Sequence, residues 1–111
     1  MKIAAVRRYA LGLPEVTEQP HFHYSSFRVR GKIFVTMPPE ETHIHVFVGE
    51  QHREPALEMY PGFVEKLLWS GKTVGLRIAL AQARAPVVHQ LVHRAWEARA
   101  PKALLAKTSA K

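Results

Sequence analysis

The sequence predicts an α+β fold of two layers, in which an antiparallel five-stranded sheet carries helices on one face. Two observations support this fold class. Apolar residues recur at helical spacing near both ends of the 111-residue chain, and they alternate with polar residues in the segments between. Tight turns join neighbouring strands, so those strands pair antiparallel and the helices collect on one side. The predicted order of elements is α-β-β-β-α-β-β-α.

Helical spacing appears first in residues 2–11 and most strongly in residues 84–99. The first helix ends at Gly12 and Pro14, which break the pattern. The second helix has one apolar stripe, formed by Val88, Leu91, Val92, Ala95 and Trp96.

Three other segments lack such a clear pattern. A short helix is predicted to begin near Arg53 or Glu54, because Pro55 is tolerated only in a first turn. Residues 15–19 are polar and are expected to form a connection. Residues 102–111 are expected to add one helical turn and then a frayed basic tail.

The first two strands are predicted within residues 22–37, where the period changes to two. Gly31 supplies the positive φ that a tight hairpin needs. Before it, successive side chains point to opposite faces, with Phe27 and Val29 in the core and Arg28 and Arg30 on the other face.

The remaining strands are predicted at residues 42–48, 63–69 and 73–80. The last two form a second hairpin that turns at Ser70-Gly71-Lys72. Inward positions on these strands are Ile44, Val46, Val48, Val74, Leu76, Ile78 and Leu80, while His43, His45, Phe47 and Arg77 face away.

Length and composition favour one domain over residues 1–111, in the cytoplasm. The chain contains no cysteine, which excludes disulfides and thiolate metal sites, and it has no apolar run long enough to span a bilayer. Sixteen Lys and Arg residues stand against nine acidic residues, giving a formal net charge of +7 and a pI of about 10.2. Such a charge favours polyanionic partners.

Several segments resemble the small bacterial MmcQ/YjbR proteins, which are often labelled DNA-binding. The resemblance extends from about Val6 to Leu104. It rests on Ala10-Leu11-Gly12-Leu13-Pro14-Glu15-Val16, Ser26-Phe27-Arg28-Val29-Arg30-Gly31-Lys32-Ile33-Phe34, Gly71-Lys72 and Ala95-Trp96-Glu97-Ala98-Arg99-Ala100-Pro101-Lys102. It implies a two-layer α/β fold similar to that of type III secretion chaperones. It implies no catalytic residue, because the family has no accepted catalytic motif.

The charged hairpins predict weak binding of nucleic acid, with DNA favoured, mainly through phosphate contacts. Lys and Arg at hairpin tips position a protein on a nucleic-acid backbone without reading its sequence. Phe47 and Phe34 are candidate stacking faces for an unpaired base. The candidate binding residues are Arg28, Arg30, Lys32, Lys66, Lys72 and Arg77.

A protein- or peptide-binding role, similar to that of a chaperone, is the alternative. Its candidate surfaces are the outer sheet face with Phe47 and the apolar segment Leu67, Leu68 and Trp69. A homodimer or another protein partner stays open for either role.

Enzymatic activity, a metal site and a cofactor are not expected. No serine lies in a nucleophile elbow and no glycine-rich phosphate loop is present. The histidines suggest metal chelation at three places, namely His21 with His23, His43 with His45, and His89 and His93 with Glu97. The helical set lacks the glutamate that a zinc-protease motif places after its first histidine, and the simpler interpretation of all three is a polar surface.

Overall fold

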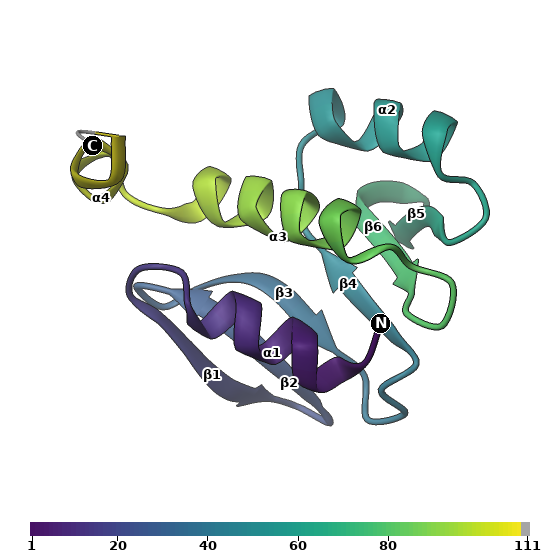
Figure 1. The fold of residues 1–111 in the computed structure, drawn as a ribbon, viewed down its shortest axis with the longest axis horizontal. Helices are drawn as coiled ribbons and strands as arrows, with labels where there is room; N and C mark the ends of the chain where they lie inside the picture. The colour runs from purple at the N-terminus through teal and green to yellow at the C-terminus, as the bar shows by residue number, and fades with distance from the viewer. Residues whose placement is uncertain (110–111) are drawn as a thin grey trace.

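An open antiparallel sheet of six strands forms one layer of the fold, and helices pack over it (Figure 1). The computed structural model of the chain describes residues 1–109. In chain order the elements are α1 (Ile3–Leu11), β1 (Val16–His21), β2 (Tyr24–Val29), β3 (Lys32–Met37), β4 (His43–Val46), α2 (Glu50–Met59), β5 (Val64–Trp69), β6 (Lys72–Ala79), α3 (Ala85–Arg99) and α4 (Lys102–Ser109). Across the sheet the order is β1-β2-β3-β4-β6-β5. The predicted α+β class with an antiparallel sheet is confirmed.

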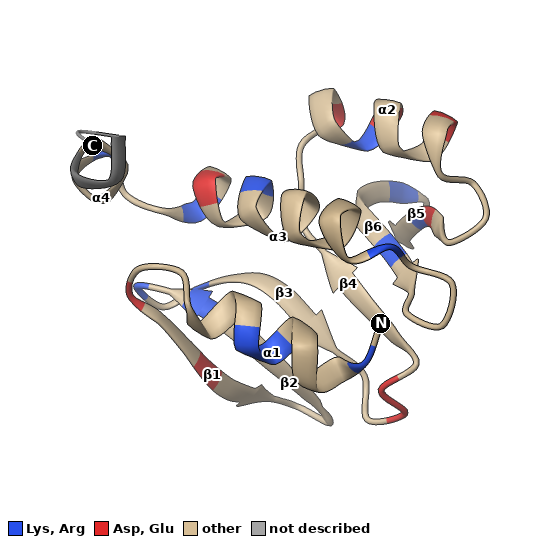
Figure 2. Cartoon of the chain, in the orientation of Figure 1, with Lys and Arg blue, Asp and Glu red and all other residues tan. Residues whose placement is uncertain are grey.

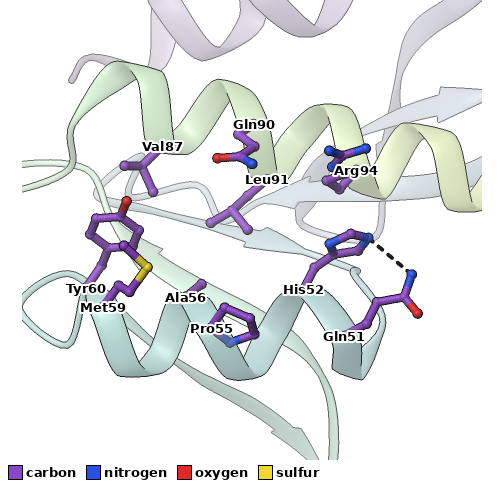
Figure 3. Close-up of a pocket in the computed structure, with 10 residues that line it drawn as sticks. All are labelled: Gln51, His52, Pro55, Ala56, Met59, Tyr60, Val87, Gln90, Leu91 and Arg94. Atoms are coloured by element: carbon purple, nitrogen blue, oxygen red, sulfur yellow. Dashed lines mark hydrogen bonds between the residues drawn. The ribbon is translucent and has the colours of Figure 1, made fainter.

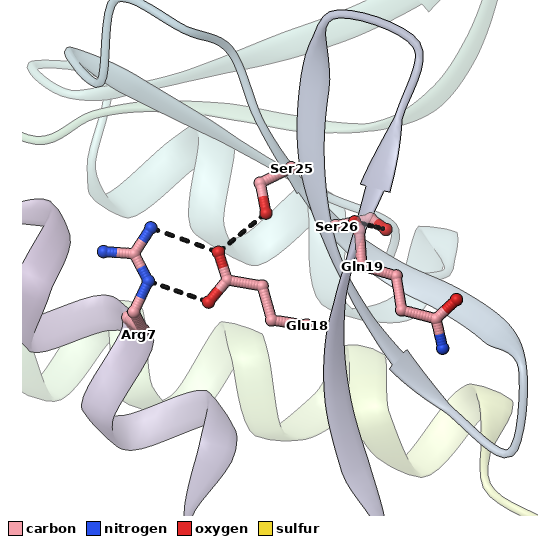
Figure 4. A network of polar contacts seen from close by, with 5 residues as sticks. All are labelled: Arg7, Glu18, Gln19, Ser25 and Ser26. Atoms are coloured by element: carbon pink, nitrogen blue, oxygen red, sulfur yellow. Dashed lines mark hydrogen bonds and ion pairs between the residues drawn. The ribbon is translucent and has the colours of Figure 1, made fainter.

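The sheet has one strand more than predicted, because β1 adds an edge beside β2. Glu18 occupies the middle of the helix-facing side of β1. Its carboxylate accepts hydrogen bonds from the Arg7 guanidinium at 2.8 and 3.1 Å and from the Ser25 hydroxyl at 2.7 Å (Figure 4). A charged network thus holds β1 to α1 where an apolar residue would otherwise pack. The prediction of a polar connection at residues 15–19 is wrong for this reason.

Two helix predictions also require correction. Helix α2 begins at Glu50, so Pro55 lies inside it and not in its first turn. Pro55 removes the hydrogen bond to the carbonyl of Gln51, and this loss is tolerable because Gln51 is exposed to water. The tail that was predicted to be frayed forms the helix α4 up to Ser109. Leu104 packs this helix against the core, where it is only 4% exposed. Residues 110–111 of that tail lie outside the described residues.

Helices α1, α2 and α3 lie on the same face of the sheet, which we call the helix face (Figure 1). The predicted apolar stripe of α3 is buried there over β3 and β4, and Phe27 and Val29 of β2 belong to the same core. Trp96 is 1% exposed, and its indole N–H donates a hydrogen bond to the carbonyl of Pro14 at 3.1 Å. This bond fixes the end of α3 to the chain between α1 and β1. Among residues 1–109, no helix has the length and apolar character needed to cross a membrane.

Both predicted hairpin turns use positive φ angles. Arg30 and Gly31 have φ of 49° and 81°, and Ser70 and Gly71 have φ of 52° and 78°. Positive φ at both central residues is the mark of the turns that fit the twist of a hairpin. The two turns therefore have matching local conformations, each followed by a lysine.

A bulge bends the second hairpin. Leu67 pairs with Gly75 while Leu68 pairs with Thr73, so Val74 is an extra residue without a partner on β5. Val74 is half-buried as a result, unlike the fully inward position that was predicted. At Gly75 a Cβ atom would meet the carbonyl oxygen of Val46, so glycine allows β6 to approach β4 closely.

Candidate nucleic-acid interface

The two lysine-bearing turns lie at the same end of the sheet. The register places Val35, Val46, Leu76 and Lys66 in one row across four strands, and both turns follow on the same side of that row. Along the sheet, about three strand spacings, or roughly 15 Å, separate the two hairpins. We call the residues around these turns, Arg30 to Lys32 and Ser70 to Lys72, the hairpin end.

At the hairpin end, the lysines and the arginine differ in whether a carboxylate already neutralises their charge. Lys32 and Lys72 are exposed and form no ion pair within the described part of the chain. Arg30 instead holds Glu15 with two hydrogen bonds of 2.8 and 3.0 Å, and this carboxylate raises the pKa of the guanidinium. The two lysines are therefore more available than Arg30 to bind a phosphate group.

Arg28 and Arg77 lie on the sheet face opposite the helices, which we call the open face. Arg28 donates to the Ser26 hydroxyl at 3.1 Å and to the Pro20 carbonyl at 3.2 Å, so its charge is not neutralised. Arg77 pairs with Glu65 at 2.6 Å. Arg30 was expected on this face with Arg28, but its position in the turn directs it to Glu15.

Lys66 lies on the helix face, because its cross-strand partner is the buried Leu76. With Lys72 it lines a hollow of about 320 Å³ beside the first turns of α2, together with Thr73, Glu50, Arg53 and Glu54. The structure thus brings Lys32 and Lys72 to one end of the sheet and places Arg28 and Arg77 on its open face. Lys66 belongs to neither group.

Basic residues are also spread over the rest of the fold. Figure 2 shows Lys and Arg on α1 and α3 as well as on β5 and β6, with acidic residues on β1 and α2. The net charge therefore does not come from the hairpins alone. What distinguishes the hairpin end is exposed lysines on two turns of the same conformation.

The open face is hollowed and rich in aromatic side chains. One hollow of about 390 Å³ is lined by His21, Phe22, His23, Tyr24, Thr36, His45 and Trp69, and an adjoining one of about 230 Å³ by His21, Ile33, Thr36, Phe47, Trp69 and Arg99. We call the two together the aromatic hollow. Phe22 and Trp69 come from opposite edges of the strand order, so the sheet curls to bring them to one hollow.

Sequence reasoning identified only part of this lining. Phe47 was proposed as a stacking face, and it is 8% exposed because its ring packs on Trp69 with centroids 5.4 Å apart. Phe34, the other candidate, is wrong for this role because it is fully buried in the core. Arg99 was missed; its position in the last turn of α3 is the only signal that the sequence offers.

The histidines contact neighbouring groups in different ways. His45 is 7% exposed, its Nδ1 lies 3.2 Å from the Thr36 hydroxyl, and burial, followed by Arg77 and His43, lowers its pKa. On α3, His89 stacks on Tyr9 with centroids 4.1 Å apart. Within residues 1–109, no three His, Asp or Glu side chains gather as a set of metal ligands.

A further hollow of about 370 Å³ lies on the helix side, between α2 and α3 (Figure 3). Pro55, Ala56 and Met59 line it from α2, and Val87, Leu91 and Arg94 line it from α3. Met59 is 65% exposed, so part of this hollow is apolar and open to solvent.

Comparison with known proteins places most of the chain in one family. The family model described as YjbR matches residues 11–98, which include every strand and the whole of α2. No curated protein and no solved structure gives a significant match. The matched range contains both lysine-bearing turns and all six predicted binding residues.

Proposed function

The chain belongs to the YjbR family, and from this premise we propose that it is a cytoplasmic nucleic-acid-binding protein and not an enzyme. The preferred ligand is DNA, bound weakly and mainly through phosphates. The supporting observation is that Lys32 and Lys72, exposed and without ion pairs in the described part of the chain, flank two turns at the same end of the sheet.

Phosphate binding at this end has a simple physical basis. Each lysine that approaches a phosphate releases condensed counterions, so affinity falls as salt rises. Arg28 adds a charge on the open face whose partners are neutral. Arg30 and Arg77 contribute less, since a phosphate has to compete with Glu15 or Glu65 for them.

The test is a salt-titrated anisotropy assay with labelled duplex DNA, single-stranded DNA and RNA. Over about 50 to 200 mM salt, the double variant Lys32→Ala/Lys72→Ala should lower the log–log slope by about 2, or 1 for each lost contact. The double variant Lys2→Ala/Arg8→Ala removes the same charge at the N-cap of α1 and within α1, and is the matched control. Equal affinity and slope in all three proteins would contradict the role of the hairpin end.

A protein-binding role is the second candidate, favoured by Leu68 and Trp69, which are 55% and 53% exposed on the edge strand β5. An edge strand with exposed apolar side chains is a common docking place for a partner segment. This role predicts a complex whose stability is unchanged over the same range of salt, together with no binding of nucleic acid at low salt.

A further inference from the structure

We propose that the aromatic hollow binds unpaired nucleotides by stacking their bases against its rings. This inference deepens the proposed function and rests on it. It assigns the open face to bases, whereas the hairpin end contacts phosphates. The favoured ligand is therefore single-stranded nucleic acid.

The first argument is the exposure of the rings. Phe22, Tyr24 and Trp69 are 90%, 38% and 53% exposed, although each would gain from burial of its apolar surface. All three line one hollow of about 390 Å³, a volume typical of sites for small molecules. Proteins that bind single-stranded nucleic acid without sequence preference use exposed aromatic rings of this kind, since every base has a π-face that can stack on them.

The backbone at Phe22 supplies a second argument. Phe22 has a φ of 58° in the β1–β2 turn, a conformation that glycine or asparagine adopts easily and a bulky residue does not. The ring is 90% exposed, and its edge contact with the His21 ring, at a centroid distance of 4.8 Å, leaves most of its surface in water, so packing in the isolated chain offsets little of this strain. Strained residues cluster at binding sites, and among the described non-glycine residues with positive φ Phe22 is the only aromatic one.

Charge decides which occupant fits the hollow. Neither part of its lining contains a carboxylate, while Arg99 lines one end and His21 lies between the two parts. Arg28 faces the same side of the sheet. This surface complements an anionic strand, whereas an apolar peptide would leave the guanidinium of Arg99 without a counter-charge.

The aromatic hollow is continuous with the hairpin end. Trp69 pairs across the hairpin with Lys72, and Ile33 follows Lys32 directly. The end of the hollow formed by Trp69 and Ile33 therefore adjoins both turns, so a strand that leaves the hollow there passes the hairpin end. Stacking and phosphate contacts act on the same ligand but depend on different residues, so they are separable by mutation.

The experiment compares three probes, namely single-stranded DNA, the same strand with abasic sites throughout, and the matching duplex. Phe22→Gly and Trp69→Leu should each weaken binding of the normal strand about tenfold, leaving duplex affinity within about twofold and the salt slopes unchanged. Met59→Ala and Leu11→Ala remove exposed apolar groups elsewhere and are the controls. Glycine suits the turn at position 22, so loss of folding is not expected there.

Intrinsic fluorescence gives an independent readout. Trp96 is buried, so the half-exposed Trp69 should account for quenching by the normal strand, and the abasic strand should quench much less. Binding of all probes with unchanged affinity in both aromatic variants would overturn the stacking inference alone. A dimer that dissociates in Trp69→Leu would assign the face to a second copy and overturn it too. Absence of binding to every probe at low salt would instead contradict the proposed function itself.

Discussion

The indole N–H of Trp96 donates a hydrogen bond to the carbonyl of Pro14 across 82 positions of sequence. Trp96 is fully buried in α3, and Pro14 lies between α1 and β1. The bond is part of the core and also aligns the end of α3, where Arg99 reaches the aromatic hollow. A packing residue of the helix layer thereby helps to position a residue on the open face.

Trp96→Phe should destabilise the fold by about 1–3 kcal/mol, because phenylalanine leaves a small cavity and the Pro14 carbonyl loses its partner. Urea denaturation measures this change. Trp69→Phe is the matched control, because Trp69 is half-exposed and its indole donates no hydrogen bond within the described part of the chain, so its substitution should change stability by less than about 0.5 kcal/mol. Equal effects of the two substitutions would argue against the Pro14 bond.

Gly75→Ala should cost about 1–3 kcal/mol, since the added methyl group meets the Val46 carbonyl oxygen and lies 3.2 Å from the Phe47 Cα. These atoms belong to the backbone and move only if β4 and β6 separate. Gly62→Ala adds the same group in open space and serves as the control in thermal unfolding. A variant at position 75 as stable as the one at position 62 would contradict the close approach of these strands.

Glu18→Gln should lower stability at neutral pH by about 1–2 kcal/mol, because it removes the charge that Arg7 and Ser25 bind. Hydrogen bonding from Arg7 lowers the pKa of Glu18, so the ionised form stabilises the folded state. This contribution is complete above the unfolded value of about 4.5 and is lost as pH falls through the lower folded value. Urea midpoints at several acidic pH values test it, with the exposed Glu58→Gln as control.

The buried His45 should cause a second loss of stability, at a less acidic pH than the loss caused by Glu18. Burial, with Arg77 and His43 nearby, lowers its pKa, so the unfolded chain binds a proton that the folded chain resists. The contribution is therefore present above about pH 6.5 and disappears as pH falls through the lower folded value. His45→Gln should flatten the slope of unfolding free energy against pH in this window, and His23→Gln, at an exposed position, is the matched control.

Elements with an apolar period could be predicted from the sequence, and those held by other forces could not. The stripe of α3 and the inward Phe27 and Val29 follow from burial and match the structure. Strand β1 has no such period, because the inward Glu18 is held by a charged network instead of apolar packing. Helix α2 begins at Glu50, before the predicted start. This is possible because Gln51 is exposed to water, so its carbonyl tolerates the loss of the hydrogen bond that Pro55 removes.

The two hairpin turns of the candidate site could be predicted from the sequence, but the aromatic hollow on the open face could not. Gly31 and Gly71 indicated both hairpins, and their common end follows once the strand order is known. The aromatic hollow depends on the order and register of the strands, which bring residues from both edges of the sheet together, so no local pattern reveals it. The position of Lys66 on the helix face depends on the same register.

The unfavourable backbone at Phe22 has a consequence for protein engineering. A selection for thermal stability alone should quickly replace this residue, since glycine relieves the positive φ and no buried contact is lost. Stabilised variants collected in this way would fold well and yet lack a ring at the mouth of the hollow. Screening them for both traits would place position 22 among the sites where robustness and ligand capture are in competition.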